Sequence, residues 1–213
     1  VVAFILYLLY PQKAKKIAYS VLWTVILLVL PALIVGADQL IFLYKSWGKM
    51  LSEDHSASYG FSVLGWLHTW FGINPDKYIT VIVGALMLCL PLIWVKKYAS
   101  YSFRILMLSS ILIWIIIFNH KAESATFIVA VSGVALWYAI EKRNWLTTSL
   151  YVFVFVCTIL APTDIYPRSI RNDIMVPYVV KAFPCILAWL FIWYRLMVKN
   201  ENVTMKPRLP GLF

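Results

Sequence analysis

The chain has 213 residues, of which 62% are hydrophobic and 13% are charged. Soluble domains have about a quarter of their residues charged, so this composition excludes an ordinary soluble protein and predicts an integral membrane protein. The net charge of +10 does not indicate a nucleic-acid partner, because basic residues also flank membrane spans for topological reasons. The three cysteines lie in apolar runs without metal-ligand spacing, which argues against a zinc site or a disulfide framework.

The first ten residues, VVAFILYLLY, are apolar. They are too few to cross a hydrocarbon layer of about 30 Å at about 1.5 Å per residue. They also lack the basic segment of a signal peptide. We expect them to be the end of a membrane span, which would make the chain the C-terminal portion of a longer protein.

Six further apolar runs are expected membrane helices, and they cover residues 17–36, 79–95, 105–118, 127–140, 146–161 and 179–198. With the partial first span they predict an all-α, polytopic transmembrane bundle of about seven spans over residues 1–213. The spans 105–118 and 127–140 are short. They either extend through the polar connector between them, or are broken helices that meet at membrane depth against protein or a wet cavity.

Basic residues are unequally distributed over the connectors. One alternate set of short connectors holds twelve of them: Lys13, Lys15, Lys16, Lys96, Lys97, Arg104, Lys142, Arg143, Arg195, Lys199, Lys206 and Arg208. The other set holds six in longer loops: Lys45, Lys49, Lys77, Lys121, Arg168 and Arg171. The positive-inside rule predicts that the first set is cytoplasmic. Lys181 falls just inside the last span, where we favour snorkelling to the outer interface over contact with a lipid phosphate.

The predicted outer loop 37–78 is too apolar for a flexible tether. Its first part has apolar side chains at helical spacing: Leu40, Leu43, Tyr44, Trp47 and Leu51. This pattern, and a second Trp-rich stretch at 61–71, predict two interfacial helices. An aromatic belt explains the tryptophans alone, but not the polar run SEDHSASYG between the helices. In that run Asp54 can cap a turn and His55 can bond a phosphate or a hydroxyl, whereas His68 has the setting of a packing residue.

The segment NHKAES at 119–124 separates the two short spans. After it, small residues form a stripe that favours close helix packing: Ala122, Thr126, Ala130 and Gly133. Ionisable groups near membrane depth are costly and tend to pair or to line cavities. His120, Lys121 and Glu123 therefore form either a basic lip for a phosphate or a structural Lys121–Glu123 pair.

The last outer loop, 162–178, contains three prolines that prevent a continuous helix. Arg168 and Arg171 are three residues apart and can share one face of a short turn. Arginine suits phosphate through its planar fork. Pairing with Asp164 and Asp173, or contact with lipid head groups, is the alternative.

The stretches QLIFLYKSW, DHSASYGFSVLGWLHTWFGI and FNHKAESATFIVAVSGVALWY resemble segments of bacterial glycosyltransferase family 87. The resemblance covers roughly residues 10–194. It implies a type C glycosyltransferase fold in the bacterial cytoplasmic (inner) membrane, with the active site facing outward. It also implies transfer of a sugar, with mannose expected, from a polyprenyl-phosphate carrier to a hydroxyl of a lipid or glycan acceptor. The expected partners are that donor, the acceptor, membrane lipids and the remainder of the same protein, with no nucleic acid.

Enzymes of this fold carry a catalytic aspartate in their first outer loop, and no carboxylate here matches it. The chain alone is therefore expected to be inactive, with His55 as an auxiliary catalytic residue. The expected donor-phosphate ligands are Lys121, Arg168, Arg171 and His120, and the sugar-binding or orienting groups are Glu123 and Asp54. The chemistry requires no metal or other cofactor. The alternatives are a transporter or flippase of lipid-linked sugars, for which the sequence shows no internal repeat, and a non-catalytic membrane scaffold subunit.

Overall fold

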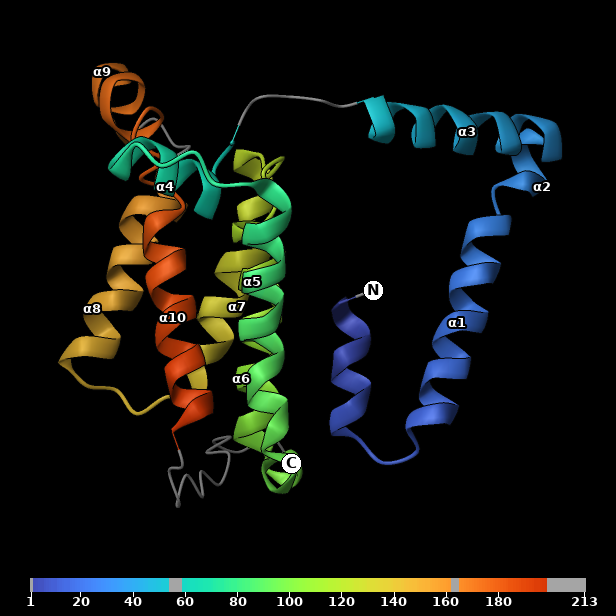
Figure 1. Cartoon of the computed structure of the whole chain (residues 1–213), viewed down its shortest axis with the longest axis horizontal. Coiled ribbons are helices and arrows are strands. Elements are labelled where there is room, and N and C mark those ends of the chain that lie inside the picture. Colours follow the sequence, from blue (N-terminus) through green and yellow to red (C-terminus); the bar gives the residue numbers. More distant parts are fainter. Residues whose placement is uncertain (1, 54–58, 162–164, 199–213) are drawn as a thin grey trace. The chain divides into compact units, whose positions relative to one another are not determined.

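The computed structural model describes residues 2–53, 59–161 and 165–198 (Figure 1). All regular elements in these ranges are helical, and no strand occurs among them. The all-α prediction is therefore confirmed for the described chain. The chain divides into two compact units, residues 3–57 and 58–213, and each is described by itself. The predicted loop 37–78 contributes one helix to each unit.

The first unit contains four helical elements: the 3₁₀ helix η1 (Val2–Leu9), α1 (Lys13–Val29), α2 (Ala32–Val35) and α3 (Ala37–Glu53). Pro31 separates α1 from α2, as expected of a residue that has no backbone N–H to donate. Gly36, with a φ of 83°, separates α2 from α3. Tyr44 of α3 donates its hydroxyl to the carbonyl of Leu28 at 2.7 Å, which ties α3 to α1.

Helices α1 and α2 together form an apolar stretch, Lys13–Val35, of 23 residues, and its most apolar 18-residue window has a mean hydropathy of 2.4. Within the described chain it is the one helical stretch long and apolar enough to cross a membrane, and none of it is buried. Leu33 and Ile34 are 83% and 89% exposed. Apolar surface in water costs about 25 cal/mol per Å², so this stretch requires a lipid or protein cover. It supports association with a membrane.

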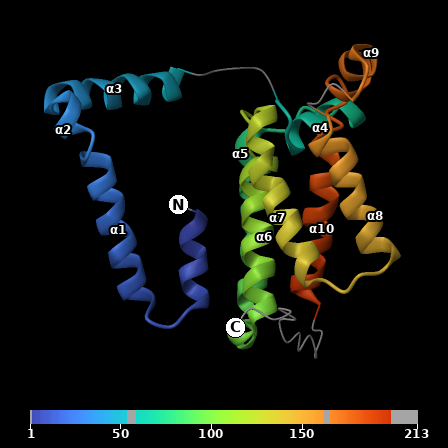
Figure 2. The same cartoon turned by 180° about the vertical axis from the view of Figure 1, so that it is seen from behind.

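The second unit is a helix bundle. Its longer helices are α4 (Val63–Phe71), α5 (Lys77–Cys89), α6 (Tyr101–Ile117), α7 (Phe127–Ile140), α8 (Trp145–Val154) and α10 (Phe183–Met197). Its short elements are the 3₁₀ helices η2 (Leu90–Ile93), η3 (Val95–Ala99) and η4 (Ser124–Thr126), the π-helical η5 (Phe155–Ile159) and η6 (Arg171–Met175), and α9 (Arg168–Ile170). Helices α6, α7, α8 and α10 lie side by side, and α4 crosses one end of the bundle (Figures 1 and 2).

The core of this bundle lies where α6 packs against α7 and α10. Trp137 of α7 and Trp189 of α10 are fully enclosed. The indole N–H of Trp189 donates to the Ser110 hydroxyl at 3.0 Å, which gives two buried polar groups a partner. Ala130 is buried, and at Gly133 the backbone of α7 comes close to that of α6. The small-residue stripe therefore packs helices as predicted, although its member Thr126 is exposed.

The end of the bundle remote from α4 is held by two charged contacts. Arg195, in the last turn of α10, donates to both carboxylate oxygens of Glu141 at 2.9 and 3.2 Å. Lys97 donates to the carbonyls of Leu196 and Val198 at 2.9 and 3.0 Å, and burial lowers the pKa of its ammonium. A lysine at this position satisfies carbonyls that the end of a helix leaves without partners.

The helix boundaries correct some of the predicted spans. The run 127–140 matches α7, and 105–118 lies within α6 apart from its last residue. The expected start of the last span at residue 179 is wrong, because Val179 adopts a φ of 52° and α10 begins at Phe183. The apolar helical stretches of the second unit are 15–17 residues long, shorter than Lys13–Val35.

We predict that Gly133→Ala destabilises the bundle. A Cβ there would lie 2.8 Å from the carbonyl oxygen of Ser109 and 3.0 Å from Ile113 Cγ1, so α6 and α7 would have to move apart. Overpacking of this kind costs about 1–3 kcal/mol. The control is Gly48→Ala in α3, where nothing lies within 4 Å of the added atom and alanine favours the helix by about 1 kcal/mol. Thermal unfolding in detergent compares them, and equal midpoints would contradict the prediction.

Candidate functional site

Three segments that are distant in sequence meet at the α4 end of the second unit. They are residues 59–62 just before α4, the α6–α7 connection at 119–124, and the residues just before α10. A Cβ on Gly60 would overlap the carbonyl oxygen of His120, so the first two segments are in backbone contact. Lys181 of the third segment binds Ser124 of the second. The site is thus assembled from segments more than 50 residues apart.

The segment before α4 is held by a buried serine. Ser62 is the N-cap of α4, and its hydroxyl accepts from the N–H of Gly65 at 3.3 Å and donates to the carbonyl of Tyr59 at 2.6 Å. This arrangement satisfies one of the N–H groups that a helix start leaves without partners. The ring of Tyr59 lies 4.7 Å from that of His68, which also bonds Asn74. His68 is exposed, so the packing role expected from the sequence stays a prediction.

The segment NHKAES forms a tight turn between α6 and α7. The side-chain oxygen of Asn119 accepts from the N–H of Lys121 at 3.0 Å, and its carbonyl accepts from the N–H of Ala122 at 3.0 Å. Asparagine commonly stabilises turns in this way. Ala122 is buried, and Ser124 begins η4, which leads into α7. The polar residues are therefore located where one apolar helix ends and the next begins.

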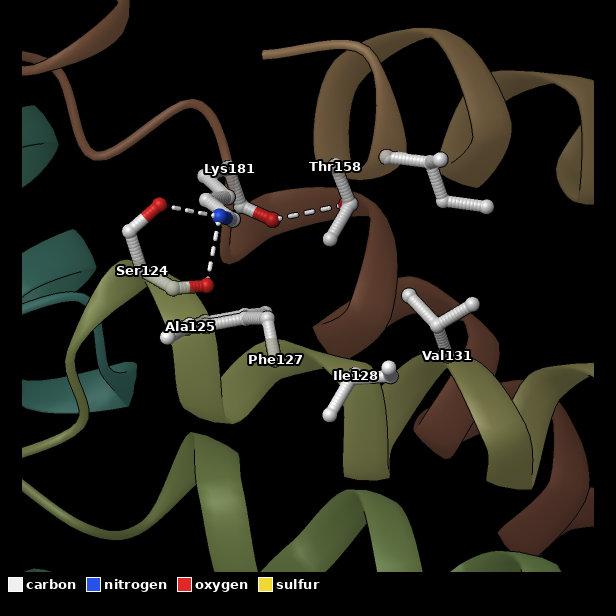
Figure 3. Close-up of a pocket in the computed structure, with 8 residues that line it drawn as sticks. Ser124, Ala125, Phe127, Ile128, Val131, Thr158 and Lys181 are labelled. Atoms are coloured by element: carbon white, nitrogen blue, oxygen red, sulfur yellow. Dashed lines mark hydrogen bonds between the residues drawn. The ribbon is translucent and has the colours of Figure 1, made fainter. Parts of the chain in front are cut away.

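Lys181 lies at the centre of the site and is only 4% exposed. Its ammonium donates to the carbonyl of Ser124 at 2.8 Å and also to the Ser124 hydroxyl, and it lies 5.3 Å from the ring centre of Phe127 (Figure 3). The backbone of Lys181 is held as well, because the hydroxyl of the buried Thr158 donates to its carbonyl at 2.9 Å. The predicted snorkelling of Lys181 is wrong, since its side chain points inward and has found polar partners there.

The electrostatic balance at Lys181 is positive. No carboxylate of the described chain lies within ion-pair distance of its ammonium. A buried cation without an anionic partner is costly. The site therefore favours an anion.

A cavity of about 280 Å³ adjoins this ammonium. Its polar side chains are Ser124, Thr158 and Lys181, and its apolar walls are Ala125, Phe127, Ile128, Val131 and Ile159 (Figure 3). One side is thus cationic and the rest is hydrocarbon. An amphiphile with an anionic head group matches that distribution of surface.

The other predicted site residues lie around this cavity or apart from it. His120 and Lys121 are half-buried in the 119–124 turn and do not line the cavity. Glu123 is exposed and makes no ion pair with a described residue. The alternative of a structural Lys121–Glu123 pair is therefore wrong. Asp54 and His55 lie outside the described residues.

The two arginines predicted for phosphate lie on the short helix formed by α9 and η6. Arg168 is exposed and Arg171 is half-buried. Neither forms an ion pair with a described residue, so the pairing of Arg171 with Asp173 is wrong; Asp164 lies outside the described residues. No group of three metal-ligating side chains occurs in the part of the chain that the structure describes.

Reasoning from the sequence missed Ser124 and Thr158, and misjudged Lys181. The signal for Lys181 was a single charge in the apolar run VPYVVKAFPC, and that for Thr158 a lone hydroxyl in VFVCTILA. Isolated polar residues in apolar runs tend to face a protein interior or a cavity. The direction of each side chain, however, depends on which helix lies beside it.

Comparison with known proteins yields no match to a protein-family model, to a curated protein or to a solved structure. A function for this chain is therefore inferred from the chemistry of the site. The central features of the site are a buried ammonium, an adjoining apolar cavity and the meeting of the 59–62 and 119–124 segments.

We predict that Gly60→Ala disrupts the contact between the first two segments. Gly60 and Gly72 both have positive φ, 53° and 66°, so an alanine is strained to a similar degree at either position, by roughly 1 kcal/mol. Only at Gly60 does the added methyl group meet a neighbour, the His120 carbonyl; nothing lies within 4 Å at Gly72. Gly60→Ala should therefore lower the free energy of unfolding by about 1–3 kcal/mol more than Gly72→Ala. Denaturant unfolding in detergent measures both, and equal losses would sink the prediction.

Proposed function

We propose that the chain is the donor-binding portion of a membrane glycosyltransferase. It would take part in moving a sugar, with mannose expected, from a polyprenyl-phosphate carrier to an acceptor hydroxyl. The observation that carries the proposal is the convergence of the 59–62 segment, the polar turn 119–124 and the buried cation Lys181 at one end of an apolar bundle. Two of these segments, around residues 59–62 and 119–124, belong to the stretches that resemble glycosyltransferase family 87. A lipid-linked sugar needs this combination of a polar end and apolar helices.

The chemistry assigns separate tasks to the groups involved. A sugar attached to phosphate already has a good leaving group, so the enzyme must activate the acceptor oxygen and stabilise charge on the departing phosphate. A carboxylate outside this chain would activate the acceptor. Cationic and hydrogen-bonding groups stabilise the phosphate; in this chain the candidates are Lys121, His120, Arg168 and Arg171, with His55 as an auxiliary group.

The proposed setting is a polytopic bundle in the bacterial inner membrane with this site facing outward. Helix α6 has 17 residues, which corresponds to about 25 Å at 1.5 Å per residue. Lys97 and Arg195 lie at the end of the bundle remote from α4, in agreement with a cytoplasmic location under the positive-inside rule. The exposed apolar stretch Lys13–Val35 adds support for a membrane location.

A flippase for lipid-linked sugars remains the alternative, and the polar turn between the two apolar helices α6 and α7 favours it, because a moving head group also needs a polar path. The two functions differ in their products. An enzyme makes a new glycosidic bond, whereas a flippase changes only the side of the membrane on which the lipid is found.

We predict that Lys121→Gln, tested in the full-length natural protein, raises the apparent KM for the polyprenyl-phosphate sugar at least tenfold, which is about 1.4 kcal/mol. The glutamine keeps most of the shape but removes a charge that attracts phosphate strongly near apolar surroundings. The KM for the acceptor should change little. Lys45→Gln, on α3, is the control and should leave both constants unchanged. An unaltered donor KM in Lys121→Gln would leave the assignment of Lys121 untenable.

The proposed orientation predicts the labelling of introduced cysteines in intact cells. In a background with Cys89 and Cys157 replaced by serine, a membrane-impermeant thiol reagent should modify Ser52→Cys directly. It should modify Lys96→Cys only after the cells are made permeable. Both parent side chains are exposed, so reactivity reports the side of the membrane. The reverse pattern would overturn the orientation.

A further inference from the structure

We propose that the cavity beside Lys181 binds a phosphate-headed lipid, with the ammonium of Lys181 against the phosphate and the apolar chain along Ile128, Val131 and Ile159. The inference concerns binding alone, and it holds whether or not the chain belongs to a sugar-transferring enzyme. It assigns a ligand to Ser124 and Thr158, which the sequence did not identify, and to Lys181, for which contact with a lipid phosphate was the less favoured interpretation of the sequence. The shared chemistry is a phosphate on an apolar chain, which either a polyprenyl phosphate or a bilayer phospholipid supplies.

The Lys181 ammonium has neither a full set of hydrogen-bond acceptors nor a charge partner within the described chain. An ammonium has three N–H donors, and two of the hydrogen bonds of Lys181 go to Ser124. The described chain offers no other acceptor to this ammonium and no carboxylate to balance its charge. Removing a cation from water without an anionic partner is unfavourable. A phosphate oxygen would supply the missing acceptor and the missing negative charge together.

The shape of the cavity also suits a lipid. The cavity, at about 280 Å³, is close to the lower limit of small-molecule sites, which is roughly 300 Å³. It therefore has room for a head group and the first part of a chain. Ile128 on its wall is 72% exposed, so the cavity opens at the surface of α7, and the rest of a long chain can continue along the outside of the bundle.

Lys181 is held in place by hydrogen bonds to both its backbone and its side chain. The carbonyl of Lys181 is fixed by the Thr158 hydroxyl, which also lies 3.7 Å from the Cys185 sulfur. Thr158 belongs to the π-helical turn η5, and such turns frequently occur at functional sites. The ammonium is thus held from both its backbone and its tip. A pre-positioned cation loses little conformational entropy when a ligand binds.

The experiment is equilibrium binding to the full chain in a neutral detergent. The probes are citronellyl phosphate, dioctanoyl phosphatidylglycerol, the neutral alcohol citronellol, and inorganic phosphate. The two phosphate-headed lipids should bind at least tenfold more tightly than citronellol or inorganic phosphate. Tighter binding of citronellyl phosphate supports the carrier as the natural source, and tighter binding of phosphatidylglycerol supports a bilayer lipid. Equal binding of citronellol would overturn the proposal, because the cation would then contribute nothing.

Variants test the residues. Lys181→Met removes the charge but keeps the apolar stem, and should raise the Kd for the phosphate lipids at least tenfold. Lys97→Met is the matched control, because Lys97 also donates to backbone carbonyls but does not line this cavity; its Kd should be unchanged. Unchanged binding in Lys181→Met would refute the assignment.

A second pair of variants covers the case in which Lys181→Met fails to fold. Val131→Phe fills the apolar part without altering the charge and should also weaken binding tenfold, whereas Lys181→Arg should retain it. Phosphate-lipid binding unaffected by Val131→Phe would refute the assignment of the cavity. Because the readout is binding, absence of sugar transfer in the full-length protein would count against the proposed enzyme and leave this inference standing.

Discussion

The close approach of α6 and α7 at Gly133 is the constraint on which the second unit depends. A side chain at this position would collide with the backbone at Ser109, so the two helices can be this close only because the residue is glycine. That spacing fixes the turn 119–124 that joins them, and the turn fixes Ser124. Since Ser124 binds the ammonium of Lys181, the geometry of the site is linked to helix packing further along α7. Small residues at such a contact let two helix backbones approach closely.

Helix α10 is anchored at both ends by cationic side chains, with different consequences. At one end Arg195 has the carboxylate of Glu141 as its partner, and the ammonium of Lys97 donates hydrogen bonds to the last carbonyls of the helix. The charge of Arg195 is balanced by a carboxylate and the ammonium of Lys97 has carbonyl acceptors. Both cations at this end therefore have a structural role. At the other end Lys181 has carbonyl and hydroxyl partners but no carboxylate in the described chain. The two ends of α10 therefore differ in charge balance: the positive charge of Lys181 has no carboxylate partner in the described chain.

Much of the fold was predictable because it depends on local pattern. The run 127–140 became α7 with the expected bounds, and the Trp-rich stretch after SEDHSASYG contains α4. The start of α10 was not predictable, because the apolar run continues through Val179 while its backbone adopts a left-handed conformation. The Lys121–Glu123 pair also failed. Two charged side chains two residues apart can pair only if the backbone between them directs them toward each other. Here the backbone at Lys121 is held by the side chain of Asn119.

The amino-acid sequence by itself determined the apolar composition, the helical class and the positions of the polar segments, because these follow from residue type and spacing. Only the tertiary structure decided that Lys181 faces inward and that Ser124 and Thr158 are its partners. The reason is geometric. A lysine stem is long enough to reach either the surface or the interior, and the choice depends on whether a neighbouring helix presents acceptors at that depth. That neighbour is Ser124 of η4, 57 residues away in sequence, and no local pattern encodes its proximity.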